Sequence, residues 1–343
     1  MSASEPVLAV EQLTVRIPTA AGTVHAVTDV DLTLRAGRVH ALVGESGCGK
    51  SVTGAAICGL LPATATVGGR VLLRDRRQPA AGDRPHRPAG RRARVLGHHG
   101  AARGLRDGAA PVDLVAASPK TWRRIRGRRI AWIPQSAATY FTPVRTIGAQ
   151  LAETCAYLES PHRPAELLDL AGLAPAAADL YPHELSGGMA QRAAIACALA
   201  ATPQVIVADE PTASLDPILT EHTLTLLRAA ADAGAAVLLI SHDLDTLAEH
   251  TDHVAVMYAS RILETGPTAA VFADPWHPYT RDLLAATPAG GLHPIPGTPP
   301  ALTDPAGDCV YHLRRPAPGF SGGPTHLTTH GDRTVRRLIG AAP

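Results

Sequence analysis

The sequence predicts an α/β fold with a parallel sheet of the doubly wound type. Short apolar runs typical of buried strands, such as 205–208 and 236–240, alternate with stretches long enough for helices, such as 219–233. A glycine-rich turn at 44–51 also joins one such strand, 39–43, directly to a helix. With 343 residues, the chain can form one large domain with an appendage, or two domains.

The glycine-rich turn matches the phosphate-binding pattern G-x-x-x-x-G-K-[ST]. Its glycines allow a tight turn whose N–H groups point at an anion, and the helix start adds partial positive charge. We expect Lys50 to reach the β- and γ-phosphates of a nucleotide, and the Ser51 hydroxyl to bind Mg²⁺, which prefers oxygen ligands. The predicted nucleotide-binding residues of this turn are Gly44, Glu45, Ser46, Gly47, Cys48, Gly49, Lys50, Ser51 and Val52.

Composition narrows the class of protein. The formal net charge of +2 implies no polyanionic partner, and the five scattered cysteines contain no C-x-x-C pair. We therefore expect neither a zinc site nor a disulfide framework. The cysteine usage is typical of a protein in a reducing compartment. The N-terminus carries no signal pattern and no apolar run is long enough to span a bilayer, so we expect a soluble chain that meets the membrane through a partner.

Three segments flank the predicted core. Residues 8–36 alternate apolar and polar positions, which predicts an antiparallel sheet beside it. Residues 74–111 are rich in arginine and lack apolar periodicity, which indicates a disordered insertion. A nucleic-acid or anionic-lipid arm is the alternative, but no aromatic residue is interleaved there for base stacking. After about residue 267 the composition shifts to Pro, His and Gly, and we expect a separate C-terminal extension.

Two further motifs carry chemistry. The strand at 205–208 ends in Asp209, which can hold Mg²⁺, and Glu210, which can polarise an attacking water. Two solvated acids at a strand end would look the same, so this pair alone is a weak signal. The segment 185–192 is more specific, because Ser186 is a good helix N-cap and is followed by two glycines that expose N–H groups to an anion.

In this order, the motifs resemble the ATP-binding subunit of ABC transporters, over roughly residues 8–300 apart from 74–111. The resemblance implies a P-loop NTPase fold, with a RecA-like core, an antiparallel β-subdomain and a helical signature subdomain. It divides the chain into an ATP-binding domain, 1–270, and a C-terminal extension, 271–343. Walker A is then 44–51, Walker B 205–210 and the signature 185–191, with D-loop and switch-loop matches at 214–216 and 241–243.

The resemblance also implies roles for single residues. The catalytic residues are Glu210, His242 and Gln135. The residues that meet the nucleotide of a partner subunit are Ser186, Gly187, Gly188 and Gln191. The Mg²⁺ ligands are Ser51, Gln135 and Asp209. The adenine-stacking residue stays unassigned.

Partners follow from the same resemblance. Two cassette subunits, identical or different, close head to tail, so that each ATP lies between the P-loop of one and the signature of the other. Transmembrane permease subunits and an extracytoplasmic substrate-binding protein complete the complex, which places this chain peripherally on the cytoplasmic membrane face. No nucleic-acid partner is expected.

Segments near both ends resemble the branch that imports dipeptides, oligopeptides or nickel, namely 24–27, 274–281 and 295–300. Such subunits hydrolyse ATP to import peptides or metal chelates. That branch often carries a cysteine cluster resembling an iron–sulfur site, but here Cys309 stands without a second cysteine and Arg315 occupies the next position. One thiolate cannot hold a cluster that needs four ligands, so we predict none.

Two alternatives stay open. One is an ABC ATPase of another class, either an exporter subunit or a soluble nucleic-acid-associated ATPase. The latter typically carries two cassettes or a coiled-coil insertion, whereas this chain has one cassette and no heptads. The other is a degenerate regulatory subunit that binds ATP without turnover, which the intact Glu210, His242 and Ser186 argue against.

Overall fold

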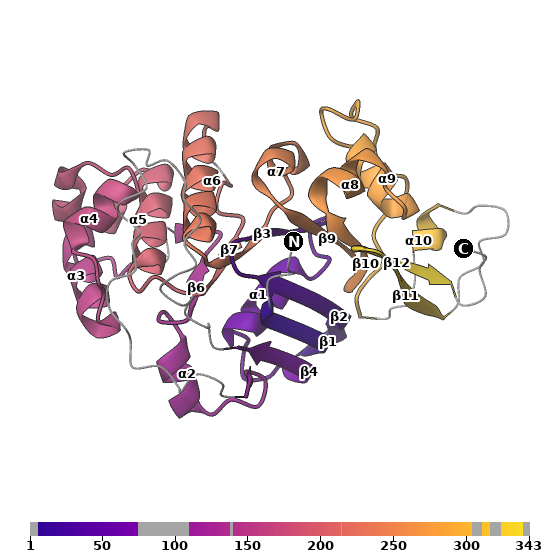
Figure 1. The fold of residues 1–343 in the computed structure, drawn as a ribbon, viewed down its shortest axis with the longest axis horizontal. Coiled ribbons are helices and arrows are strands. Elements are labelled where there is room, and N and C mark those ends of the chain that lie inside the picture. Colours follow the sequence, from indigo (N-terminus) through magenta and orange to yellow (C-terminus); the bar gives the residue numbers. More distant parts are fainter. Residues whose placement is uncertain are drawn as a thin grey trace, which may run out of the picture.

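A computed structural model describes residues 6–74, 110–137, 140–213, 215–303, 311–315 and 324–338. The described residues form an eight-stranded central sheet in the order β11-β12-β10-β9-β3-β8-β7-β6 (Figure 1). Neighbours from β9 to β6 pair in parallel, and β10, β12 and β11 extend the sheet antiparallel. The strands are β3 Val39–Val43, β6 Ile130–Ile133, β7 Val205–Asp209, β8 Ala236–Ile240, β9 His253–Tyr258, β10 Arg261–Pro267, β11 Thr325–His330 and β12 Arg333–Leu338.

The parallel strands are buried on both faces, which explains their nearly continuous apolar sequences. In β7, Ile206 and Ala208 face one hydrophobic core, whereas Val205 and Val207 face another. Side chains alternate across a strand, so one short strand contributes to both cores. The predicted parallel α/β sheet is confirmed.

Helices on one face pack against the first core and include the predicted helical region 146–203. They are α3 Ile147–Leu158, α4 Pro164–Leu170, α5 Gly187–Leu199, α6 Pro217–Asp232 and α7 Leu244–His250, with short 3₁₀ turns at Pro175–Asp179 and Pro182–Glu184. Figure 1 shows α3, α4 and α5 grouped at one end of the molecule. Helix α6 stops before Gly234, whose φ of 102° lies in the left-handed region.

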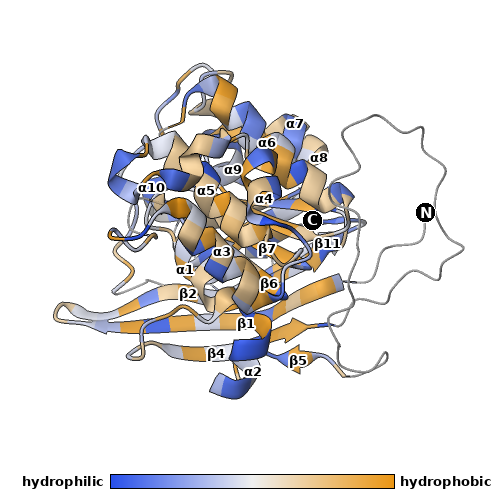
Figure 2. Cartoon of the chain, turned by 90° about the vertical axis from the view of Figure 1, so that its left-hand side faces the viewer, coloured by the Kyte–Doolittle hydropathy of each residue, from blue (hydrophilic) through white to orange (hydrophobic). Residues whose placement is uncertain are grey.

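The second core lies between helix α1, Lys50–Cys58, and a four-stranded antiparallel sheet of order β2-β1-β4-β5. Its strands are β1 Pro6–Thr19, β2 Gly22–Arg35, β4 Thr66–Leu73 and β5 Val112–Asp113, and helix α2, Pro119–Ile125, follows them. Figure 2 shows β1, β2 and β4 as a layer of their own, so the predicted antiparallel sheet at 8–36 is confirmed. Most of the arginine-rich segment, 75–109, lies outside the described residues, as do Ser214 and Cys309.

The C-terminal region joins the main sheet rather than standing apart from it. Helices α8 Thr268–Ala273, α9 Pro278–Ala285 and α10 Tyr311–Arg314 lead to β12, which pairs with β10 at Glu264 and Thr265. Tyr279 and Tyr311 are buried in the same core as the signature helix α5. The predicted C-terminal extension therefore adds strands to the main sheet, and the domain boundary at 270 stays a prediction.

A buried carboxylate anchors this region. Glu264 is fully buried and accepts hydrogen bonds from the backbone N–H groups of Trp276, at 3.0 Å, and His277, at 2.9 Å. Arg333 of β12 donates to it at 2.8 Å and lies 3.8 Å over the Trp276 ring. One carboxylate thus ties together β10, the segment before α9, and β12.

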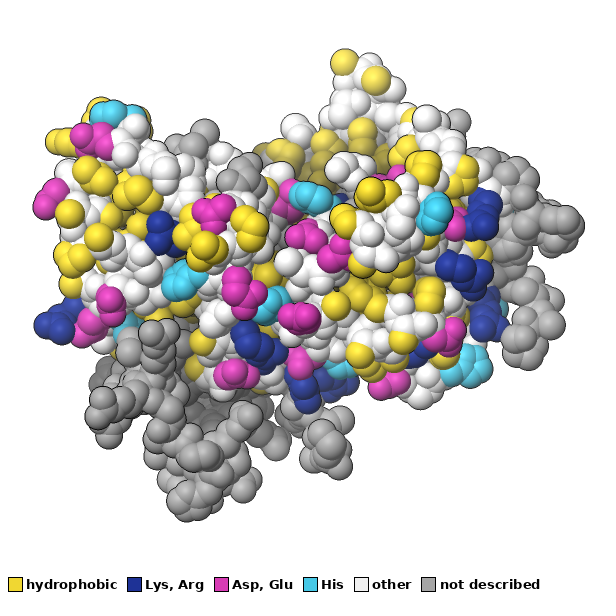
Figure 3. All heavy atoms as spheres, turned by 90° about the horizontal axis from the view of Figure 1, so that it is seen from above, with side chains coloured by type: hydrophobic (Ala, Val, Ile, Leu, Met, Phe, Trp, Pro, Cys, Tyr) yellow, Lys and Arg dark blue, Asp and Glu magenta, His cyan; other side chains and the backbone are white. Residues whose placement is uncertain are grey.

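No helix in the described ranges combines the length and apolarity needed to cross a bilayer. On the face seen in Figure 3, acidic, basic and hydrophobic side chains are interspersed. That distribution agrees with the small net charge of the chain.

Candidate functional site

The phosphate-binding turn has the backbone that its glycines predict. Gly44 and Gly49 adopt φ values of 147° and 109°, and Gly49 caps helix α1. A Cβ at Gly44 would lie 2.0 Å from the carbonyl oxygen of Met257, and one at Gly49 would lie 2.1 Å from that of Ala26. Only glycine fits at either position.

Lys50 lies inside this turn and is buried. Its ammonium donates to the carbonyl oxygens of Gly44, at 2.7 Å, and Glu45, at 2.9 Å. Neighbouring Cys48 is also buried, and burial raises the pKa of its thiol. The lysine is thus held by the start of its own loop, beside the N-terminus of α1, where an anion is favoured.

The predicted magnesium ligands Ser51 and Asp209 meet. The Ser51 hydroxyl donates to the Asp209 carboxylate at 2.9 Å, although 158 residues separate them. Burial is the largest influence on Asp209 and raises the pKa of its carboxyl above the usual range. A buried carboxylate beside a hydroxyl at a helix start is a hard-oxygen donor set, so these residues fit Mg²⁺.

The three predicted catalytic residues converge at the carboxyl ends of β6, β7 and β8. Gln135 donates its side-chain amide to one Glu210 oxygen at 3.0 Å, and His242 Nδ1 lies 3.3 Å from the other. Glu210 has a φ of 45°, a left-handed conformation that costs about 1 kcal/mol or more for a residue other than glycine. The Glu210 backbone N–H donates to the carbonyl oxygen of Ile240 at 2.9 Å, and this hydrogen bond holds the strained residue in place.

The predicted signature begins helix α5. Ser186 is its N-cap and accepts from the Met189 N–H at 3.2 Å, and both Ser186 and Gly187 are exposed. A Cβ would have open space at Gly187, whereas at Gly188 it would lie 2.9 Å from Leu219. Among the hydrogen bonds of the described residues, none joins Ser186 to the phosphate-binding turn.

Gln191 takes a different position from the other signature residues. Its side chain is only 4 % exposed, and its amide donates to the Pro134 carbonyl at 2.9 Å. It therefore braces the residue just before Gln135. The predicted contact of Gln191 with a partner's nucleotide stays a prediction.

Sequence reasoning missed two residues that contact the phosphate-binding turn. The Glu45 N–H donates to the Tyr279 hydroxyl at 2.9 Å, and Arg314 pairs with the Glu45 carboxylate at 2.5 Å. Tyr279 lies in the segment 274–281 that resembles peptide importers, but nothing local marks Arg314. Its neighbour Arg315, which stands where a second cysteine would fall, pairs with Asp282.

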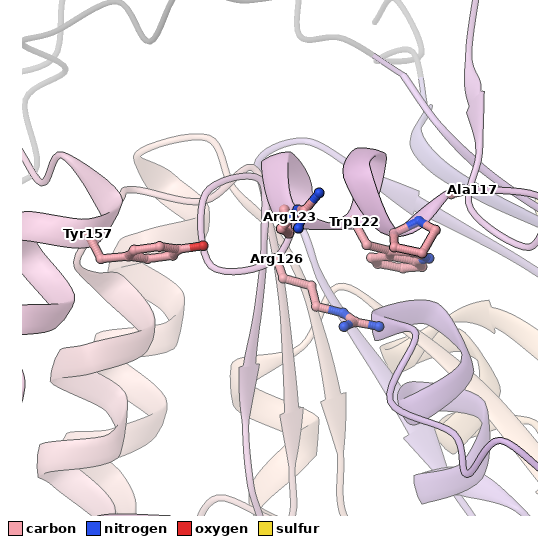
Figure 4. Close-up of a pocket in the computed structure, with 6 residues that line it drawn as sticks. Ala117, Trp122, Arg123, Arg126 and Tyr157 are labelled. Carbon is pink, nitrogen blue, oxygen red and sulfur yellow. The ribbon is translucent and has the colours of Figure 1, made fainter.

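A cavity of about 480 Å³ lies away from these residues (Figure 4). It is near the start of β6, where Arg126 bridges to Ile130, whereas Gln135 follows the other end of that strand. Among the described residues that line it, none carries a carboxylate or an imidazole. They are Ala117, Pro119, Trp122, Arg123, Arg126 and Tyr157.

Comparisons with known proteins agree with this geometry. A family model described as ABC transporter matches residues 27–213, and one described as oligopeptide/dipeptide transporter, C-terminal region, matches 263–318. The dipeptide transport ATP-binding protein DppD of Bacillus subtilis is 36 % identical over 328 residues, which cover 91 % of this chain and 87 % of that protein. The probable D,D-dipeptide transport ATP-binding protein DdpD of Escherichia coli is 36 % identical over 348 residues, covering 97 % and 96 %.

Among solved structures, the dimeric post-hydrolysis state of the ATP-binding cassette MJ0796, bound to ADP and Pi, shares the fold. Its TM-score is 0.59 at 20 % identity, covering 76 % of this chain and 98 % of that one. The predicted cassette fold is thereby confirmed. The chain belongs to the ABC transporter family, as an ATP-hydrolysing subunit that carries the C-terminal region of oligopeptide/dipeptide transporters.

Proposed function

We propose that this subunit pairs with a second cassette subunit and hydrolyses ATP to import dipeptides or oligopeptides through permease subunits. It would lie on the cytoplasmic face of the membrane, and a binding protein on the other face would deliver the peptide. The observation that carries the proposal is the meeting of Gln135, Glu210 and His242 at the same edge of the sheet as the Ser51–Asp209 pair. The peptide names of the relatives favour peptides over the nickel chelates that the sequence left open.

Each side chain has a task in phosphoryl transfer, which depends on positioning and on stabilising charge. Lys50 would offset the negative charge of the β- and γ-phosphates. Glu210 would orient and activate the attacking water, held between the Gln135 amide and the His242 ring. Ser51 and Asp209, with Gln135 nearby, would hold Mg²⁺, which supplies further positive charge at the phosphates.

The exposed signature supports a head-to-tail dimer. Ser186 and Gly187 are exposed at the start of α5, and a Cβ added at Gly187 would meet open space. A helix start of this kind favours an anion, and the nucleotide bound by the partner subunit would supply it. Each copy would then complete the site of the other.

Replacement of Glu210 tests the hydrolytic role. Glu210→Gln preserves the size of the side chain, so MgATP affinity should stay within about threefold while turnover falls by roughly 10²–10⁴-fold. Phosphate release and binding of a fluorescent ATP analogue measure the two effects. Glu153→Gln, which changes an exposed carboxylate on α3, is the matched control and should leave both unchanged. Turnover close to wild type in Glu210→Gln would contradict the assignment.

Replacement of Lys50 tests binding of the triphosphate. Lys50→Ala removes a charged hydrogen-bond donor and should weaken binding at least about tenfold. Unchanged affinity for the analogue would count against the role of the turn.

The peptide substrate requires the whole transporter. Vesicles that contain this subunit, its partner cassette and the permease, supplied with the binding protein, should accumulate a labelled dipeptide or oligopeptide only with MgATP. Uptake of a nickel chelate in place of every peptide tried would refute the substrate class but not the hydrolytic role.

A further inference from the structure

Glu45, the second residue of the phosphate-binding turn, is bound on three sides. Its N–H donates to the Tyr279 hydroxyl at 2.9 Å, and its carboxylate accepts from Arg314 at 2.5 Å. Its carbonyl oxygen accepts from the Lys50 ammonium at 2.9 Å. One residue therefore connects the phosphate-binding lysine to two side chains of the C-terminal region.

Tyr279 is a rigid support for this contact. It is fully buried at the start of α9 and packs against Tyr258 and Tyr311, with ring centroids 4.5 and 5.2 Å apart. Its own N–H donates to His277 Nδ1 at 3.0 Å, which fixes the first turn of the helix. Burial raises the pKa of the Tyr279 hydroxyl, so the group stays neutral and accepts the Glu45 N–H as a hydroxyl.

Arg314 is held as firmly from another segment. Its side chain is almost fully buried, and it donates to the carbonyl oxygens of Pro296, at 2.9 Å, and Gly297, at 3.2 Å. The guanidinium also lies 5.7 Å from the Tyr258 ring centroid. Because its donors are fixed in one plane, a guanidinium held by these carbonyls presents its remaining N–H to Glu45 in a set direction.

We propose that Tyr279 and Arg314 are positioning residues for ATP hydrolysis. By fixing the Glu45 peptide they fix the carbonyl oxygen that orients Lys50, so the docked C-terminal region sets the affinity of the turn for the triphosphate. This inference rests on the proposed hydrolytic function. Because coupling between sites is reciprocal, bound MgATP also strengthens docking of the C-terminal region.

Arg314→Met is the principal test, because it keeps the length of the side chain and removes the charge-assisted hydrogen bonds. The KM for MgATP should rise about tenfold or more, with a smaller change in kcat. Arg314→Lys, which keeps the charge but not the planar fork, should recover part of the loss. The matched control is Arg315→Met, which changes the next residue, breaks its pair with Asp282 of α9 and should leave KM within about twofold.

A double-mutant cycle separates this role from general stabilisation. Glu45→Gln removes the same ion pair from the other side, so Glu45→Gln combined with Arg314→Met should raise KM no further than the worse single variant. Additive effects would show that the two residues act independently and would overturn the proposal. A wild-type KM in a folded Arg314→Met variant would overturn it as well.

Tyr279→Phe decides the matter if Arg314→Met fails to fold, because it deletes one hydroxyl and keeps the packed ring. Its KM should rise about threefold to tenfold; an unchanged KM would then refute the inference. Failure of the proposed function gives a different result, since the wild type would then release no phosphate. In that case affinity for a fluorescent ATP analogue, measured across the same variants, still tests the positioning role.

Discussion

Two carboxylates of this molecule, Glu210 and Glu264, are held in opposite ways. Glu210 directly follows β7 in a strained conformation and contacts two side chains, one of which, His242, is 62 % exposed. Glu264 is fully buried and accepts from two backbone N–H groups and from Arg333. The partners of Glu210 can rotate away, whereas Glu264 has two partners fixed by the backbone and a third, Arg333, that is buried.

The difference explains what each carboxylate can do. A side-chain partner can exchange its hydrogen bond for one to a phosphate or a water by rotating about a few bonds. A backbone N–H cannot move away from the carboxylate without local unfolding. A buried guanidinium that loses its carboxylate destabilises the folded protein strongly. Substitution at Glu210 should therefore change rate, as proposed above, whereas substitution at Glu264 should change stability.

The largest expected effect of the second kind comes from Glu264→Ala. It leaves the buried Arg333 guanidinium with only the exposed Asp274 carboxylate, 3.7 Å away, and frees two backbone N–H groups, which should lower the free energy of unfolding by about 3–5 kcal/mol. Urea unfolding followed by tryptophan fluorescence measures the change, and Trp276 lies beside the site.

Glu153→Ala provides the control for this comparison, because Glu153 pairs with Arg145 at the surface. Its loss should cost no more than about 1 kcal/mol. Similar losses in both variants would mean that burial does not distinguish the two ion pairs. Turnover per folded molecule at saturating MgATP should change little in either variant.

Much of the site around Lys50 and Glu210 was predictable from the sequence, because its motifs are local. The turn around Lys50, the acids at the end of β7 and the histidine after β8 are each defined by neighbours in the chain, and parallel strands bring their ends to one edge of the sheet. The meeting of Gln135, Glu210 and His242 follows from that topology.

The C-terminal end was not predictable in the same way. Arg314 and Glu45 are 269 residues apart, and only tertiary packing selects this arginine among many. Strands β11 and β12 were missed because THLTTH and RTVRRL show little apolar alternation. They form because β10 offers an edge and Glu264 binds Arg333, neither of which is a local property.

The pH dependence of stability gives a further test of the region around Glu264. His277, whose backbone N–H donates to the Glu264 carboxylate, is buried. Burial lowers the pKa of its imidazole to about 3. The unfolded chain binds a proton there below about pH 6.5, whereas the folded protein does not. Stability from this group is therefore complete above pH 6.5 and falls with decreasing pH, by about 1.4 kcal/mol per pH unit.

Urea unfolding at pH 7.5, 6.5, 5.5 and 4.5 measures this slope. His277→Asn is the informative variant, because its side-chain oxygen can accept the Tyr279 N–H in place of Nδ1 but does not titrate. Below pH 6.5, the slope of the unfolding free energy against pH should decrease by the contribution of one histidine, about 1.4 kcal/mol per pH unit. The remaining slope includes His40, which burial likewise brings to a pKa of about 3. An unchanged slope in His277→Asn would mean that this imidazole is protonated in the folded protein.

The smallest expected effect lies after β7, where an exposed residue caps helix α6. Asp216 accepts from the Leu219 N–H at 2.9 Å at the start of α6, and Asp216→Ala should lower the free energy of unfolding by about 1 kcal/mol. Asp216→Asn caps equally well and should cost only a few tenths of that. If the asparagine variant lost as much as the alanine variant, attraction between the carboxylate and the helix dipole would be the dominant contribution. Either value lies well below that expected for Glu264, because an exposed cap that is lost can be replaced by water and a buried carboxylate cannot.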